Sequence, residues 1–391
     1  MRPASDPTPF RIGLGEATGA VADLGVFVPL AIALIVVNGL AAGAVLLAAG
    51  ALVLVSGVVF RVPFPVQPLK ALTAVAVAEH LAPEVIHAAG FEIAAFLLLM
   101  SVKHVADWIA HAFTHPVVRA LQFGVGVLLV IAAAKLVVDP PAVFVGTPSS
   151  PWPVILGALV LGIVVWEAHR KRYGIALAVL AVGVIGAIIA VRPEIGVPTF
   201  ALPSVSLPPV AAFGTAFVLL VIPQLPLTFG NAVVAVTELE REYFGARASR
   251  VTPSNVCISC GLGNAFSALI GGMPMCHGSG GLTAHYRMGS RTAGMNLLLG
   301  AAFVALGLFF STQVVTIVGL LPVWVLAAFL AYAGVRHAIL VFDTHGMTLL
   351  AMVVAGAIGA WLGNLAVTAA LALLFVHLPR LARKPAAREP D

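Results

Sequence analysis

The sequence predicts an all-α polytopic membrane protein. Hydrophobic residues make up 61% of the 391 residues, charged residues make up only 9%, and the mean hydropathy is +1.07. A soluble domain carries about 25% charged residues, so this chain has too few polar groups to cover a surface that faces water. In a bilayer, a spanning helix needs about 20 mostly apolar residues, because each backbone polar group must be satisfied within the segment. Many segments of the chain meet this requirement.

Apolar runs separated by charged or proline-rich breaks predict about fourteen spans. No small-residue cleavage site follows the first run, so we expect it to remain as a spanning helix and not to be removed as a signal peptide. The expected spans are 24–40, 42–60, 65–82, 90–102 or 90–114, 119–138, 153–168, 174–191, 210–238, 254–272, 274–288, 292–310, 313–334, 346–361 and 363–378.

Lysine and arginine residues test this count, because the cytoplasmic loops of membrane proteins are enriched in them. If the N-terminus is in the cytoplasm, all but three of the 21 lysine and arginine residues fall in expected cytoplasmic segments; the three exceptions are Lys70, Lys135 and Arg192. A single miscounted span would invert every later loop and mix the two groups. The segregation therefore predicts an even number of spans, both termini in the cytoplasm and insertion in the cell inner (cytoplasmic) membrane. The expected cytoplasmic residues are Arg2, Arg11, Arg61, Lys103, Arg119, Arg170, Lys171, Arg172, Arg241, Arg247, Arg250, Arg287, Arg291, Arg336, Arg380, Arg383, Lys384 and Arg388.

A proline-rich stretch, residues 192–209, divides the chain into two halves of seven expected spans, 1–195 and 196–391. Two halves that each have an odd number of spans, joined in one chain, lie in opposite orientations across the membrane. This is the inverted-repeat architecture of many secondary transporters. The sequence therefore predicts two inverted seven-span repeats.

Two of the expected spans are interrupted, and each is the third span of its half. In residues 61–70, alternate prolines prevent a helix until Pro68 takes a first-turn position. In residues 271–282, glycines make a helix costly until about Thr283. Interrupted segments in matching positions of two halves point to the binding site of a transporter.

Because the halves have opposite orientations, both interrupted spans are expected to begin extended and to become helical near the middle of the bilayer. Two helix N-termini then face each other. Their unpaired N–H groups and the helix macrodipole, about half a positive charge per end, form an anion site that needs no metal or cofactor. The alternative is that the prolines and glycines are kinks and close-packing contacts, which are common in membrane helices.

The candidate substrate-binding residues are polar or small residues at this depth. For Lys70 the sequence leaves three roles open: attraction of an anion, a pair with Asp23 or Glu16, or packing. Asp23 is either the N-cap of the first helix or a functional carboxylate. The full set is Asp23, Gln67, Pro68, Lys70, Gln224, Thr228, Asn231, Cys276, His277, Gly278, Ser279, Gly280 and Gly281.

Proton coupling has four candidates. His277 lies at the second interruption and is expected to contact the substrate or to carry a proton, since histidine titrates near neutrality. The other candidates are Glu16, Asp23 and Glu79. Cys257 and Cys260 form a CxxC pair without a second ligand pair, so we expect buried thiols and not a zinc site.

At these residues the chain resembles the molybdate transporter family, which belongs to the sulfate permease superfamily. The resemblance implies fourteen spans in a seven-plus-seven inverted fold, with a core domain (spans 1–4 and 8–11) that moves against a gate domain (spans 5–7 and 12–14). It also implies molybdate as the cargo, with sulfate or tungstate as co-substrates of the same charge and shape. We further expect a homodimer in the bilayer. The stretches that carry the resemblance are 16–25 with Pro29, 63–71, 224–233, and 274–282 continuing through 286–291.

Other functions remain open at this point. The same fold could carry sulfate, a carboxylate or a nucleobase, and an anion channel is a different class. A membrane-embedded enzyme is disfavoured, because the eleven histidines are scattered and no HExxH motif occurs. Nucleic acid is not an expected partner, since the basic balance follows from the cytoplasmic loops.

Overall fold

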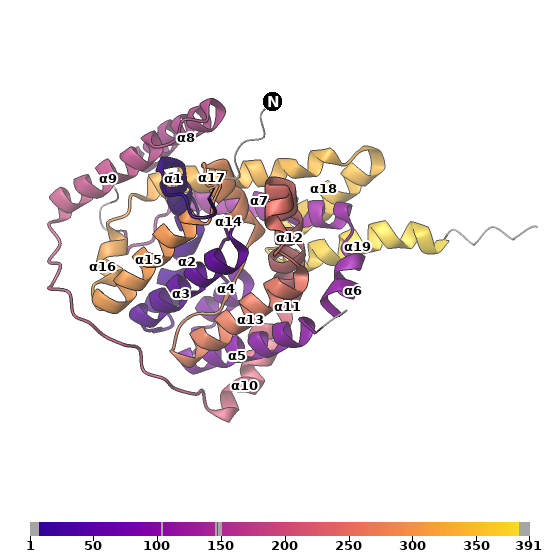
Figure 1. The fold of residues 1–391 in the computed structure, drawn as a ribbon, viewed down its shortest axis with the longest axis horizontal. Coiled ribbons are helices and arrows are strands. Elements are labelled where there is room, and N and C mark those ends of the chain that lie inside the picture. Colours follow the sequence, from indigo (N-terminus) through magenta and orange to yellow (C-terminus); the bar gives the residue numbers. More distant parts are fainter. Residues whose placement is uncertain (1–7, 103–104, 145–146, 148–150, 383–391) are drawn as a thin grey trace, which may run out of the picture.

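The computed structural model describes residues 8–102, 105–144, 147 and 151–382, and most of these residues are helical (Figure 1). The first half contains α1 (Leu14–Ala22), α2 (Leu24–Val36), α3 (Ala42–Phe60), β1 (Gln67–Pro68), α4 (Lys70–Ala78), α5 (Pro83–Met100), α6 (Val105–Ala112), α7 (His115–Val138), α8 (Trp152–Arg170) and α9 (Ile175–Val191). The second half contains α10 (Val210–Ala216), η1 (Phe217–Val221), α11 (Ile222–Leu227), η2 (Thr228–Val234), α12 (Ala235–Phe244), η3 (Gly245–Ala248), α13 (Pro253–Leu269), β2 (Met275–Cys276), α14 (Ser279–Arg287), α15 (Gly294–Phe309), α16 (Val314–Gly319), α17 (Val323–Ala338), η4 (Ile339–Asp343), α18 (Gly346–Trp361) and α19 (Leu365–Ala382).

Several helices are long and apolar enough to cross a membrane. In the described part of the chain six helices meet this condition by length and composition, or seven if the bent pair of α1 and α2 is one span. Four shorter apolar helices add to them: α9, α15, α18 and residues Leu365–Val376 of α19. The count of fourteen stays a prediction. The expected cytoplasmic ends, residues 1–7 and 383–391, and Lys103 lie outside the described residues.

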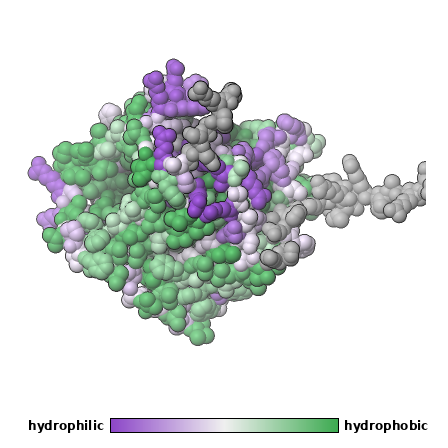
Figure 2. Space-filling model, in the orientation of Figure 1, coloured by the Kyte–Doolittle hydropathy of each residue, from purple (hydrophilic) through white to green (hydrophobic). Residues whose placement is uncertain are grey.

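The molecular surface has the apolar character that lipid requires. Figure 2 shows a broad hydrophobic face, with hydrophilic residues gathered mainly in the upper part of the view. Large apolar side chains such as Val182, Ile189 and Trp361 are 68%, 67% and 83% exposed. In water, exposed apolar patches larger than a few hundred Å² are unusual, so these helices are built for contact with acyl chains.

Several expected boundaries are wrong; α5, for example, begins at Pro83 and not at residue 90. The first span was expected to begin at Leu24, but helix already starts at Leu14 and continues into α2 with a bend of 42° beside Asp23. The expected span 313–334 is divided into α16 and α17, because Pro322 stands at the N-cap of α17 and helix does not continue through the residue before a proline.

The proline-rich stretch forms an extended strap that joins the two halves. It leaves α9 and follows the outside of the molecule to α10, at the left and bottom of Figure 1. Its backbone is held by the ends of two helices: Thr199 and Ala201 donate to carbonyls at the end of α15, and Ser206 donates to Leu269 of α13. Prolines cannot supply these donors, and the strap uses the residues between them.

The two interrupted segments cross near the centre of the molecule as short antiparallel strands. Gln67 of β1 pairs with Cys276 of β2, and Pro68 pairs with Met275. In each interrupted span the extended segment is followed by a short helix, which we call a half-helix. The expectation that Pro68 opens the first half-helix is wrong, because Pro68 belongs to the strand pair and α4 begins at Lys70. The second half-helix, α14, begins at Ser279, four residues before the expected Thr283.

Two buried asparagines hold the extended segments in place. Asn296 of α15 accepts a hydrogen bond from Phe64 N (3.0 Å) and donates to Phe64 O (2.7 Å). Asn264 of α13 makes the same pair of bonds with Met275, both 2.7 Å long. Extended backbone inside a bilayer has no water to satisfy it, so each asparagine supplies the partner that a neighbouring strand would provide.

We predict that Asn264→Ala and Asn296→Ala each destabilise the protein strongly. Asn296→Ala leaves the buried N–H and C=O of Phe64 unpaired. Asn264→Ala leaves the N–H of Met275 unpaired and its C=O with only the weak thiol donor of Cys260 (3.3 Å). Each unpaired group costs about 1–3 kcal/mol. The melting temperature of detergent-purified protein measures the effect. Asn255→Ala is the matched control, because Asn255 is exposed and donates to only one carbonyl, that of Arg250. Equal melting temperatures for all three variants would contradict the assignment.

Candidate functional site

The N-termini of α4 and α14 come together at the strand crossing, and we call this region the half-helix site. Leu69, the N-cap of α4, donates from its N–H to Pro274 O (3.1 Å), and so ties the start of one half-helix to the segment that precedes the other. The first N–H groups of a helix have no partner within it. Lys70 and Ala71 of α4, and Ser279 and Gly280 of α14, therefore direct free donors into this region, and both helix dipoles add positive potential.

A short polar chain joins three of the predicted site residues. Gln67 Nε2 donates to Asp23 Oδ1 (2.5 Å), and Lys70 Nζ donates to Gln67 Oε1 (2.7 Å). The expected direct pair of Lys70 with Asp23 is absent from the ion pairs of the described residues, since the neutral amide stands between the two charges. Asp23 does occupy the N-cap position of α2, but its side chain makes no capping bond to the helix start and accepts from Gln67 instead.

Two glycines allow this chain to lie against the start of α14. A Cβ atom at Gly278 would lie 2.0 Å from Gln67 Oε1, and a Cβ atom at Gly281 would lie 2.6 Å from Asp23 Oδ2. Gly280 faces elsewhere, because its Cβ atom would meet Leu129 and Val125 of α7 at 3.0 and 3.3 Å. Gly278 and Gly281 therefore admit the polar chain, and Gly280 admits the neighbouring helix.

The expected eighth span supplies a side chain to each half-helix. Gln224 Oε1 accepts from Leu72 N of α4 (2.9 Å), and Gln224 Nε2 donates to Thr228 (3.0 Å). Asn231 Oδ1 accepts from Ser279 Oγ of α14 (2.5 Å). Both amides lie beside wide π-helical turns, which widen a helix and occur often at functional sites. These turns were not expected from the sequence.

His277 and the residues of the strand pair differ in what they can offer a ligand. His277 Nδ1 donates to Pro65 O (2.8 Å), Nε2 lies 3.0 Å from Ser259 Oγ, and the ring packs edge-on against Phe64. Both nitrogens are therefore engaged in holding the first extended segment, which favours a structural role over substrate contact. The buried Cys276 thiol lies close enough to Asp23 and Lys70 to interact with their charges.

The candidates for proton coupling separate in the structure. Glu16 accepts from the N–H groups of Arg291 and Thr292, at 3.0 Å each, away from the strand crossing. Glu79 is exposed at the end of α4. Asp23 is the one of the three candidate carboxylates that lies at the half-helix site, where it accepts from Gln67. Proton coupling itself stays a prediction.

The sequence analysis missed His337 of α17. It is fully buried and bridges two residues of α14, Ser279 (3.1 Å) and Thr283 (2.8 Å). Because Ser279 donates to the oxygen of Asn231, its hydroxyl accepts from His337 Nε2, which leaves Nδ1 to accept from Thr283. The sequence feature that could have pointed to this residue is a histidine next to Arg336 at the end of an apolar run.

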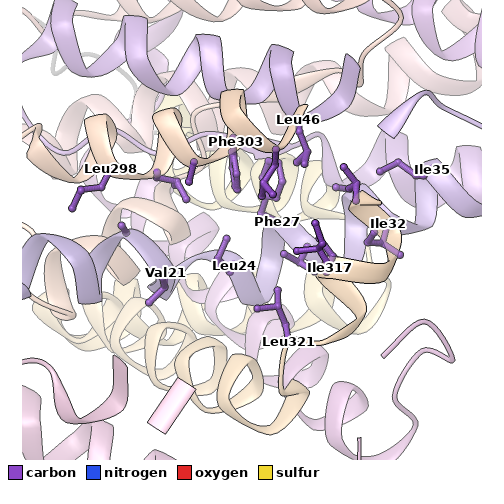
Figure 3. Close-up of a pocket in the computed structure, with 18 of the residues that line it drawn as sticks. Val21, Leu24, Phe27, Ile32, Ile35, Leu46, Leu298, Phe303, Ile317 and Leu321 are labelled. Carbon is purple, nitrogen blue, oxygen red and sulfur yellow. The ribbon is translucent and has the colours of Figure 1, made fainter. Parts of the chain in front are cut away.

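One cavity leads to the half-helix site and another does not. A cavity of about 480 Å³ lies between α2, α4, α7, α17 and α19; its charged lining residues are Lys70, at the start of α4, and Lys135 and Asp139, at the C-terminal end of α7. Val125 and Leu129, which face Gly280, line its wall. The pocket in Figure 3 has a volume of about 330 Å³ and is lined by apolar side chains such as Phe27, with no charged group. Such a lining cannot stabilise a dianion.

Two solved structures resemble the fold closely. The transmembrane domain of the cyanobacterium bicarbonate transporter BicA superposes with a TM-score of 0.58 and 17% sequence identity, over 92% of this chain and 96% of that chain. The overall structure of SLC26A9 superposes with a TM-score of 0.60 and 14% identity, over 93% of this chain and 64% of that chain. At these identities the likeness shows the fold alone.

Sequence relatives cover most of the chain. It is 31% identical to Molybdate transporter 2 of Arabidopsis thaliana over 83% of this chain and 78% of that protein, and 30% identical to Molybdate transporter 1 of the same plant over 86% and 81%. Molybdate transporter 1 of Chlamydomonas reinhardtii is 29% identical over 84% of both chains. Residues 15–129 and 216–336 match the family described as "Molybdate transporter of MFS superfamily". The chain therefore belongs to the molybdate transporter family, a family of transporters and not of enzymes.

Proposed function

We propose that this protein moves molybdate across the membrane by alternating access, and that the anion binds where the N-termini of α4 and α14 meet. The observation that carries the proposal is the crossing of β1 and β2, which brings two sets of free N–H donors together. The names of the relatives support molybdate as the cargo. Sulfate and tungstate share its charge and tetrahedral shape and are the expected competitors.

The donor set suits a dianion that must also leave. Backbone N–H groups and neutral amides stabilise an oxyanion without a full opposite charge, and conduction or transport requires binding that is favourable yet reversible. Lys70 is the one cation in the polar chain, and it donates to the amide oxygen of Gln67, not to a carboxylate. Its charge is therefore available to an incoming anion.

The packing of the helices supports two related halves and two moving bodies. Helix α3 packs on α15, and α5 packs on α13. In the expected numbering, the first contact joins spans 2 and 11, and the second joins spans 4 and 9. Spans 2 and 9 occupy the same position in their halves, as do spans 4 and 11, so the two contacts are equivalent under an exchange of the two halves. Helices α7, α8, α17, α18 and α19 pack mainly among themselves, as a gate domain should. The core and gate division remains part of the proposal.

One end of the boundary between these bodies is open and the other is closed. Most of the exposed residues in the cavity lining, among them Lys135, Asp139 and Pro141, lie at or just after the C-terminal end of α7, which makes this the accessible end. At the other end, Arg119 pairs bidentately with Asp343 after α17 and reaches Glu242 of α12 (3.0 Å). Glu242 belongs to the proposed core, and Arg119 and Asp343 belong to the proposed gate. With the predicted orientation the closed end faces the cytoplasm, and inward release would require the Arg119–Glu242 pair to separate.

We predict that purified protein in proteoliposomes takes up labelled molybdate, that sulfate and tungstate compete, and that Gly278→Ala lowers uptake by about tenfold or more. The added methyl group displaces the Gln67 amide and so breaks the link to Lys70; a loss of 1.4 kcal/mol in binding is tenfold. The backbone itself accepts alanine, since Gly278 has a φ of −76°.

Gly186→Ala is the matched control, because a Cβ atom at Gly186 would meet no atom within 4 Å. Normal uptake by Gly278→Ala would remove the half-helix site from the account. Uptake by wild-type protein of uracil or a carboxylate in preference to molybdate would remove the cargo assignment.

We predict that Glu242→Gln shifts the protein toward the state that is open at the Arg119 end. It removes the Arg119–Glu242 pair between the two bodies, and it keeps the Arg119–Asp343 pair within the gate and the His115–Glu238 contact (3.5 Å). Because Glu242 is 40% exposed, solvent screens the pair, and screened pairs contribute about 0.2–1 kcal/mol, which corresponds to a population change of up to about fivefold. Spin labels at the exposed positions Arg241 and His345 would report it as a growing long-distance population. An unchanged distance distribution, equal to that of Glu79→Gln, would count against this closure.

A further inference from the structure

The cavity that Lys70 lines carries a second lysine, Lys135. Lys135, in the last turn of α7, is exposed and lines this cavity together with Asp139. Apart from these three charged residues, the lining consists of apolar side chains, glycine and proline.

Lys135 is unusual among the lysine and arginine residues of the chain, because it lies outside the expected cytoplasmic segments. Only Lys70, Lys135 and Arg192 fall outside the expected cytoplasmic segments. Two of these three cations line the same cavity, and Arg192 does not. Lys70 and Lys135 outnumber Asp139 in this lining, so the cavity has a net positive charge. An excess of one sign of charge between apolar walls focuses the field and raises the local concentration of a counter-ion.

The ammonium of Lys135 is not neutralised by a close carboxylate. The ion pairs within 4.0 Å that the described residues form involve His115, Glu238, Arg119, Glu242 and Asp343, and none includes Lys135. Asp139 lies one turn further along the chain and lines the same mouth. A lysine in the last turn also interacts favourably with the helix dipole, so a purely structural role predicts an effect on stability and not on anion capture.

Lys135 is displaced along α7 from the half-helix site. Leu129, which faces Gly280, is six residues earlier on α7, or about 9 Å along the helix axis at 1.5 Å per residue. That separation is close to the Debye length of about 8–10 Å at physiological salt. A charge at this distance acts on an approaching anion through the field, and its effect depends on ionic strength.

We propose that Lys135 forms an outer recruiting site for the transported oxyanion, and that Asp139 moderates it. The proposal rests on the proposed function, and it assigns to Lys135 the capture of the anion at the mouth before the anion reaches Lys70. Lys135 then sets the apparent affinity for a doubly charged substrate, whereas the donors of α4 and α14 set the chemistry of the bound state.

The test measures initial rates of labelled molybdate uptake into proteoliposomes at several concentrations, at low and at physiological ionic strength. Lys135→Gln should raise KM roughly threefold to fivefold at low ionic strength, the effect of one charge on a dianion at that distance in water. Its kcat should stay unchanged, and its KM should depend less on salt than that of wild type. Asp139→Asn should change KM in the opposite direction.

Arg192→Gln is the matched control, because it removes the third non-cytoplasmic cation without altering the cavity. Equal KM values and equal salt dependence for Lys135→Gln and Arg192→Gln would overturn the proposal. So would a fall in melting temperature accompanied by a lower kcat at unchanged KM, which would place Lys135 in the stability of the helix end. Absence of uptake by wild-type protein would instead contradict the proposed function, so the two failures are distinguishable.

Discussion

The structure depends on the antiparallel contact between two extended segments inside an otherwise helical protein. Gln67 and Pro68 pair with Cys276 and Met275, and this pairing stops both third spans from continuing as helices. Extended backbone in a membrane interior is tolerated only where the protein itself satisfies it. Asn264 and Asn296 do so here, and the N-termini of α4 and α14 come together as a consequence.

A chain of polar side chains then connects this crossing to the rest of the molecule. On one side Asp23, Gln67 and Lys70 are joined through an amide that separates the two charges. On the other side His337 joins α14 to α17, and with it the proposed core to the proposed gate. A group that bridges both bodies must change partners when they move, so the polar contacts that fix the site also limit the motion that transport requires.

Backbone chemistry made the interruptions predictable from the sequence. Alternate prolines before Lys70 and glycines around Gly278 forbid or weaken helix at fixed positions. The orientation that the segregation of lysine and arginine predicts stays a prediction. Side-chain direction was not predictable. Nothing in the sequence shows that both His277 nitrogens serve the extended segment, that Gly280 faces α7, or that His337 reaches Ser279, because these follow from helix rotation and packing.

The location of a bound heavy oxyanion tests the central claim most directly. Tungstate has the charge and shape of molybdate and scatters strongly, so its anomalous signal in crystals, or its density in a cryo-EM map, fixes its position without reference to transport. The account predicts one peak within hydrogen-bond distance of the free N–H groups at the starts of α4 and α14, near Lys70 Nζ. A fully occupied peak elsewhere, with the crossing of β1 and β2 intact and empty, would contradict it.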